Sequence, residues 1–127
     1  MSEFTISEAH NTARLEATVA FADTGTTPSR IEFYDASEQL LVSVALAKPC
    51  GSVAGGVLVL IAADPTGTLI TADGIATHAT WFSGNNTLVA AGSVSDATGD
   101  GPFILQGTSG TQLYAGGRAV MGDTEIT

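Results

Sequence analysis

Basic residues are scarce in this chain of 127 residues. Four lysines and arginines stand against thirteen aspartates and glutamates, which gives a formal net charge of −9. The four cations are Arg14, Arg30, Lys48 and Arg118, and they are scattered along the chain. A nucleic-acid binder needs clustered cations to displace counterions from phosphates, and docking on anionic lipid has a similar requirement. The charge balance therefore argues against nucleic acid and against a membrane surface as partners.

Cysteine and long apolar runs are also scarce. The single Cys50 cannot form an internal disulfide, which favours a reducing compartment. The longest apolar run, GGVLVLIAA at 55–63, is too short to span a bilayer as a helix and suits a strand buried on both faces. The N-terminal MSEFTISEAH lacks the basic and apolar regions of a secretory signal. We therefore expect a protein with no membrane segment that is made or assembled in a cytoplasm.

The overall composition is that of a globular domain. Charged residues make up 13% of the chain and apolar residues 44%, whereas disordered acidic chains and coiled coils carry far more charge. A chain of 127 residues is the size of one ordinary domain, so residues 1–127 are predicted to fold as a single unit. Fifteen glycines suit many tight turns between short strands.

One helix is predicted, near the N-terminus. After an arm at 1–6, Ser7 can cap a helix, Glu8 suits the positive end of the helix dipole, and alanines recur along one side. Gly25 is a natural stop. These signals predict a helix over 7–24.

Strand periodicity begins at Ser29 and continues to the end of the chain, over 29–127. SRIEFYD places Ile31 and Phe33 on one face, which makes Phe33 a candidate core anchor. DASEQ supplies a turn into LLVSVAL, where the alternate residues Leu40, Val42, Val44 and Leu46 are expected to share the buried face.

Turn signals separate the remaining strands. Pro49 is expected to end the second strand, because proline cannot donate to a ladder, and PCGSVAGG at 49–56 is interpreted as a flexible loop. Further strands are predicted at 57–62, in TLITA, at 75–82, after the SGNN turn, in FILQG and at 118–126. In the hairpin ATWFSGNNTLVAAGSV, Trp81 shares a face with Ile75 and Ala79 and is the second candidate core anchor.

The sum predicts a mainly β fold with one N-terminal helix. Many short strands with closely spaced turns are typical of a single-domain β-sandwich, a jelly roll or a small barrel, and these share one sequence pattern.

The sequence matches catalytic and metal-binding motifs only poorly. DATGDG at 96–101 resembles the start of a calcium loop, with Asp96 and Asp100 as candidate ligands, but its twelfth position is Gly107 where a bidentate Glu is needed. An acidic surface loop is the favoured interpretation, and no metal or cofactor is predicted. His10, His78 and Cys50 lie in no nucleophile elbow or His-x-x-x-His pair, so we expect no enzyme.

The aromatic residues suggest a second function, in sugar binding. Tyr34, Trp81, Phe82 and Tyr114 could form a sugar-stacking platform on a β-sandwich, although the parity of Trp81 places it inside. The alternative function is therefore a carbohydrate-binding or receptor-binding module.

Several stretches in order carry a resemblance: IEFYD, LLVSVALAKP, GGVLVLIAA, GIATHATWFSGNNTLVAAGSV and LYAGGRAVMGDTEIT. From Ile31 onward the chain resembles a group of small proteins encoded in the structural-gene regions of tailed bacteriophages and prophages. That group shows an N-terminal helix, a LEIY strand, an ATWFR strand and an AGG bend before the last strand. This chain departs from the group at WFSG, where the group usually continues WFRV, and at FILQGTSGTQLY.

The resemblance implies a non-enzymatic virion protein, made in the host bacterial cytoplasm, that serves as a capsid decoration, neck or tail component. Its partners would be other phage structural proteins and copies of itself, as a homo-oligomer. Few charges and many small residues suit such packing. A terminal strand can dock by strand addition, so Arg118, Val120 and Ile126 are candidate interface residues.

Overall fold

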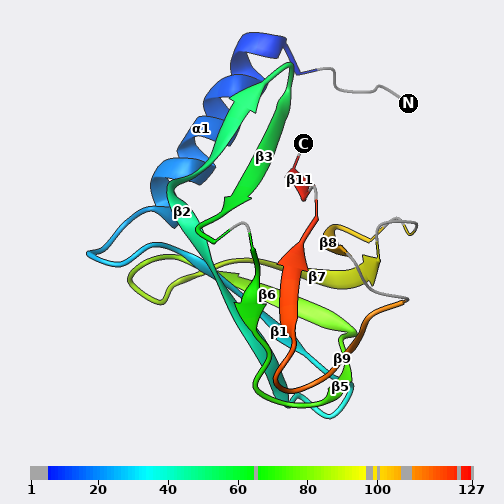
Figure 1. Cartoon of the computed structure of the whole chain (residues 1–127). Coiled ribbons are helices and arrows are strands. Elements are labelled where there is room, and N and C mark those ends of the chain that lie inside the picture. Colours follow the sequence, from blue (N-terminus) through cyan, green and yellow to red (C-terminus); the bar gives the residue numbers. More distant parts are fainter. Residues whose placement is uncertain are drawn as a thin grey trace.

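The structure is a computed structural model that describes residues 6–64, 66–96, 99, 101–106, 110–122 and 124–126. It is mainly β, with 50% of the chain in strands, one N-terminal helix and a sheet that curls into a half-barrel (Figure 1). The predicted fold class is confirmed at this level.

The helix α1 (Glu8–Ala22) begins where its cap was predicted. Ser7 has an extended backbone, and its hydroxyl accepts a hydrogen bond from the backbone N–H of His10 at 3.2 Å. The helix ends two residues earlier than expected, at the cap residue Asp23, whose backbone leaves the helical conformation and whose N–H donates to the carbonyl of Val19, while that of Thr24 donates to the carbonyl of Phe21. The helix buries Leu15 and Ala22 and packs on β2 and β3.

Within the described residues, nine strands form the curled sheet. Their order is β11 (Glu125–Ile126), β3 (Val57–Ala62), β2 (Leu40–Ala54), β1 (Arg30–Tyr34), β6 (His78–Phe82), β7 (Leu88–Asp96), β8 (Phe103–Gln106), β10 (Arg118–Met121) and β4 (Thr68–Leu69). A small second sheet pairs β5 (Gly74–Ile75) with β9 (Gln112–Leu113). Just after β4, Thr71 donates its backbone N–H to the carbonyl of Leu41 in β2 at 2.9 Å. This bond brings the β4 end of the sheet back against β2.

The first hairpin confirms the predicted turn and corrects one buried position. Asp35 holds the turn, because its Oδ1 accepts the backbone N–H groups of Ser37 and Gln39, each at 2.9 Å. Residues 31, 33, 42, 44 and 46 are buried as expected. Leu40 is instead exposed and Leu41 is buried, because the register shifts: Phe33 pairs with Val42, but Tyr34 pairs with Leu40.

The predicted loop at 49–56 is wrong. Strand β2 continues through Pro49 to Ala54, and the turn into β3 is formed by Gly55 and Gly56, both with positive φ. The pairing of β2 with β3 is irregular between Leu46 and Gly51, so Pro49 lies where the ladder requires no donor.

Two other predicted strands are interrupted. The strand expected at 75–82 is divided into β5 and β6, so Ile75 is exposed while Ala76 is buried. The strand expected at 118–126 is divided into β10 and β11, since Gly122 bonds back to the carbonyl of Ile104 and the carbonyl of Thr124 accepts the N–H of Leu60. The TLITA segment forms only the two residues of β4.

The β6–β7 hairpin also docks against the end of the helix. Trp81 pairs with Ala90 across the hairpin, and Asn86 in the turn has a φ of 68°. The N–H of Gly84 donates to the carbonyl of Ala22 at 3.0 Å, and the hydroxyl of Thr27 donates to the carbonyl of Gly84 at 2.7 Å. The turn therefore joins the helix end to the sheet.

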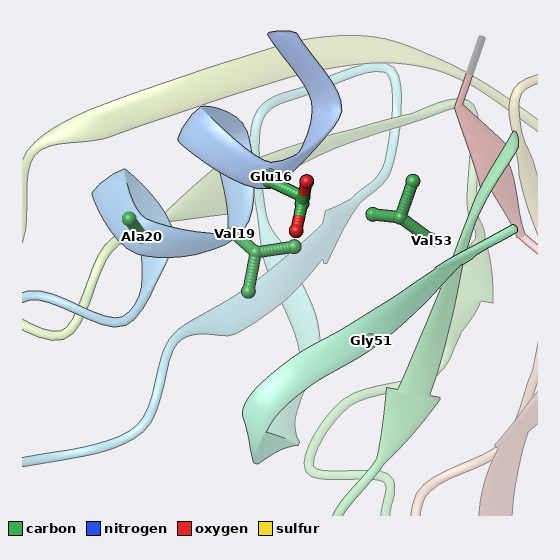
Figure 2. Close-up of a pocket in the computed structure, with 5 residues that line it drawn as sticks. All are labelled: Glu16, Val19, Ala20, Gly51 and Val53. Atoms are coloured by element: carbon green, nitrogen blue, oxygen red, sulfur yellow. The ribbon is translucent and has the colours of Figure 1, made fainter. Parts of the chain in front are cut away.

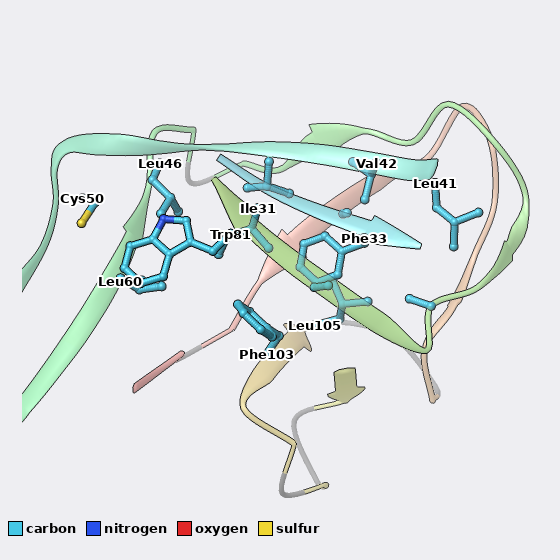
Figure 3. Close-up of a cluster of buried hydrophobic side chains, with 14 of the residues drawn as sticks. Ile31, Phe33, Leu41, Val42, Leu46, Cys50, Leu60, Trp81, Phe103 and Leu105 are labelled. Carbon is cyan, nitrogen blue, oxygen red and sulfur yellow. The ribbon is translucent and has the colours of Figure 1, made fainter. Parts of the chain in front are cut away.

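The core fills the inside of the curled sheet. Figure 3 shows Trp81 lying between Leu46 and Leu60, with Phe33 farther along the same face. Trp81 and Phe33, the two predicted core anchors, have no exposed surface. Strand β8 contributes Phe103 and Leu105 to the same cluster.

Candidate functional site

A row of polar and aromatic side chains lies on the outer face of β1 and β6. Because alternate residues of β1 point outward, Arg30, Glu32 and Tyr34 share this face, and the register places Tyr34 directly opposite His78. We call these four residues, with Glu38 from the β1–β2 turn, the outer-face network. The alternation within β1 was visible in the sequence, whereas the pairing with His78 depends on the register between strands far apart in the chain.

Glu32 is the centre of the outer-face network. Its Oε2 accepts a hydrogen bond from Nε of Arg30 at 2.8 Å, and its Oε1 accepts one from the hydroxyl of Tyr34. The guanidinium of Arg30 also lies over the ring of Phe82, 4.8 Å from its centroid, and donates to Oδ1 of Asn86 at 2.7 Å. The carboxylate and the cation are thus both paired.

The other half of the network is built around His78. Its ring stacks on that of Tyr34 with centroids 5.5 Å apart and an interplanar angle of 17°. Its Nε2 lies 3.0 Å from Oε1 of Glu38, and its Nδ1 lies 2.8 Å from the hydroxyl of Thr77. Both ring nitrogens therefore have partners.

The environment fixes the protonation of Glu32 and Tyr34. Burial raises the pKa of Tyr34, the hydrogen bond to Glu32 raises it further, and together they bring it to about 12. Burial alone would raise the pKa of Glu32, but the hydrogen bonds from Arg30 and Tyr34 outweigh it and hold this pKa below its usual value. At neutral pH the tyrosine is a donor and the glutamate an acceptor. A proton-transfer catalyst needs a pKa close to the working pH, so this pair is suited to holding structure.

The three residues considered for hydrolysis lie on different elements. His10 is exposed in the first turn of α1, Cys50 is buried in β2, and His78 belongs to the outer-face network. Burial raises the pKa of the Cys50 thiol to about 12, with a further contribution from the charge of Asp23, which accepts the backbone N–H of Cys50 at 3.3 Å. A thiol in this state is a poor nucleophile at neutral pH.

The candidate calcium loop is described only in part. Oδ2 of Asp96 accepts the backbone N–H of Gly110 at 2.9 Å. Asp100 lies outside the described residues. Among the residues that the structure describes, no three His, Cys, Asp or Glu side chains gather as a metal site would require.

Hollows lined by described residues include two on the surface. One, of about 290 Å³, lies between α1 and β2 and is lined by Glu16, Val19, Ala20, Gly51 and Val53 (Figure 2). The other, also about 290 Å³, lies between β7, β8 and β11 and is mostly apolar; its lining includes Ala90, Phe103 and Ile126. A hollow of this size lies at the lower limit for small-molecule sites.

The predicted interface residues lie on two strands. In β10, Arg118 is exposed and donates to the carbonyl of Gly67 at 2.8 Å, while Val120 is half-buried. In β11, Ile126 is half-buried and lines the second hollow. The structure does not bring Arg118 and Ile126 onto one continuous strand.

Comparison with models of protein families, with curated proteins and with solved structures finds no match to this chain. Among the helices that the structure describes, none combines the length and apolar character needed to cross a membrane.

Proposed function

We propose that this chain is a non-enzymatic structural protein of a tailed-phage virion, a capsid decoration, neck or tail component that acts by self-association or by docking on other virion proteins. The resemblance of its sequence to proteins of phage structural-gene regions supports this role. The structural observation that carries it is the exposure of large apolar side chains. Among the residues that the structure describes, eight of these side chains are between 40% and 65% exposed: Ile6, Phe21, Leu40, Ile61, Leu69, Ile75, Leu88 and Tyr114.

Exposed apolar side chains favour assembly because burying them against another protein is stabilising, by about 25 cal/mol for each Å² removed from water. Charged residues make up 13% of the chain, so few charges have to be desolvated when a surface is covered. The outer-face network supports a stable scaffold, since each of its charged groups already has a partner within the chain.

Mass spectrometry of purified particles tests the proposal. Heads and tails of the source phage or induced prophage are separated before digestion, and particles from a phage deleted for this gene are the control. Peptides of the chain at constant stoichiometry with heads would support a decoration or neck protein, and with tails a tail component. Absence of the chain from both fractions would refute the virion role.

A carbohydrate-binding or receptor-binding module of a phage tail is the second candidate. Tyr114 favours it, because this aromatic ring is 65% exposed, whereas Tyr34 is half-buried and stacked on His78. A glycan array probed with the full chain and with Tyr114→Ala separates the two functions. Sugar binding predicts a signal that the substitution removes, and an empty array would rule this candidate out.

A further inference from the structure

Three segments far apart in sequence meet at the end of the half-barrel opposite α1. They are residues 35–40, 70–78 and 112–117, which we call the open pole (Figure 1). Gly74 pairs with Leu113 across the small sheet, and the side-chain amide of Gln112 donates to the carbonyl of Gly74 at 3.1 Å. The N–H of Thr77 donates to the carbonyl of Tyr34 at 2.9 Å, which joins the second segment to the end of β1.

The open pole exposes large apolar side chains from each of its segments. Leu40 is 40% exposed, Ile75 is 57% exposed and Tyr114 is 65% exposed. Leu69 lies at its margin, one residue before Ile70, and is 55% exposed. Of the eight large exposed apolar residues in the described part of the chain, four therefore lie in or beside this one end of the molecule.

The charges of the open pole have one sign. Its three segments contain Asp35, Glu38 and Asp73 and no lysine or arginine. Two of these carboxylates accept backbone hydrogen bonds through Oδ1. Oδ1 of Asp35 accepts the N–H of Ser37, and Oδ1 of Asp73 accepts the N–H of Ala115 at 2.6 Å. His78 lies beside Glu38, which is the more exposed of the two, with 75% of its side-chain surface accessible. Arg118 follows the third segment, but its guanidinium donates to Gly67.

We propose that the open pole is a docking surface for a different protein chain, whose contact face has an apolar centre and a rim of lysine or arginine. Burial of Leu40, Ile75 and Tyr114 would supply affinity, while the three carboxylates would select and orient a basic partner. This inference goes beyond the virion role and does not require it.

A second copy of the chain does not fit this surface. A symmetric pole-to-pole contact would bring two acidic surfaces together, because the three segments carry Asp35, Glu38 and Asp73 and no lysine or arginine. The cations of another copy would also form a poor basic rim for this contact. They are spread over the molecule and hold internal contacts, Arg14 with Asn11, Arg30 with Glu32, Lys48 with the carbonyl of Gly25 and Arg118 with that of Gly67. Charge complementarity therefore points to a basic protein of another kind.

Binding of two synthetic peptides to the full chain tests the proposal. One peptide alternates leucine and lysine, and the other, of equal length, alternates leucine and glutamate. We expect the first to bind and the second not to bind. Neutralising two carboxylates of the open pole with Glu38→Gln and Asp73→Asn should weaken binding of the leucine–lysine peptide about fivefold, because each exposed ion pair contributes modestly. The apolar pair Ile75→Ser and Tyr114→Ser should weaken it about tenfold or more.

A matched double variant serves as the control. Ile61→Ser with Leu88→Ser removes two apolar side chains of similar exposure outside the open pole, and it should bind the leucine–lysine peptide as the unchanged chain does. Equal weakening in this control, or full binding by both pole variants, would overturn the proposal. So would an absence of binding by the unchanged chain. If sedimentation shows a dimer that the pole variants dissociate, the occupant is a second copy and the proposal is wrong.

Discussion

The two ends of the half-barrel differ in how closely the chain packs around them. At the end that we call the covered end, α1 lies over β2 and β3, and the β6–β7 turn docks beneath the helix terminus through Gly84. A Cβ on Gly84 would lie 2.0 Å from the carbonyl oxygen of Thr27, so the backbones there are in close contact. At the open pole, a Cβ on Gly116 would meet nothing within 4 Å. The covered end is packed for stability, whereas the open pole leaves its apolar groups available to a partner.

The largest expected effect comes from the core next to the covered end. Trp81→Ala should lower the free energy of unfolding by about 4 kcal/mol, because it removes a fully buried indole and leaves a cavity. Tyr114→Ala, at the open pole, should change it by less than about 0.5 kcal/mol. Urea unfolding followed by circular dichroism measures both. A similar loss in the two variants would show that the open pole is part of the folding core.

A glycine pair sharpens the same comparison. Gly84→Ala should destabilise the fold by about 3 kcal/mol, because the methyl group would clash with backbone oxygens that cannot move independently. Gly116→Ala should cost about 1 kcal/mol, since its φ of 90° strains an alanine but the surrounding space is open. Thermal melting distinguishes them, and equal melting temperatures would contradict the contrast between the ends.

The two tyrosines differ in their surroundings, and a titration reports on one of them. The pKa of Tyr34 is raised from 10.0 to about 12, so its neutral form is favoured in the folded state. The stability that this provides is present below pH 10 and is lost as the pH rises through 10 towards 12. Tyr114→Phe leaves Tyr34 as the one tyrosine, and its ultraviolet titration should then have a midpoint near 12. Tyr34→Phe should remove this part of the stability loss at alkaline pH. A titration midpoint near 10 for Tyr34 in the Tyr114→Phe variant would contradict the geometry of the network.

The smallest effect concerns the single cysteine. Cys50 is buried and its pKa is raised to about 12, so a thiol reagent at neutral pH should react only through opening of the covered end. We expect slow labelling of the native chain, faster labelling in Gly84→Ala, and nearly unchanged labelling in Gly116→Ala. Mass spectrometry follows the reaction, and rapid labelling of the unchanged chain would show that this end opens readily.

Local signals predicted much of the fold. The Ser7 cap located the start of α1, and alternation located β1 and the β6–β7 hairpin, because these features depend on neighbouring residues. The alanine stripe did not mark the packed side of the helix, since Ala9, Ala13, Ala17 and Ala20 are exposed and α1 buries Leu15 and Ala22 instead. The errors lie where pairing between strands decides the outcome. Leu41 takes the buried place expected for Leu40 because the ladder shifts by one residue, and Pro49 lies within β2 because the pairing there is irregular.

The candidate surfaces were less accessible to sequence reasoning. Outward alternation of Arg30, Glu32 and Tyr34 was visible, but the stacking of Tyr34 on His78 follows from the β1–β6 register. The open pole joins three segments that are separated by tens of residues, so no single stretch of sequence carries its pattern. The proposed virion role rests on the sequence resemblance and on the exposed apolar side chains.

Zero-length crosslinking of intact particles tests the account most directly, because carbodiimide joins carboxylates to lysines that they touch. The account predicts that the chain is present in heads or tails and that Asp35, Glu38 or Asp73 is joined to a lysine of another virion protein. Crosslinks that avoid the open pole and arise at α1 carboxylates such as Glu16 would contradict the docking surface. Absence of the chain from the particles would contradict the virion role itself.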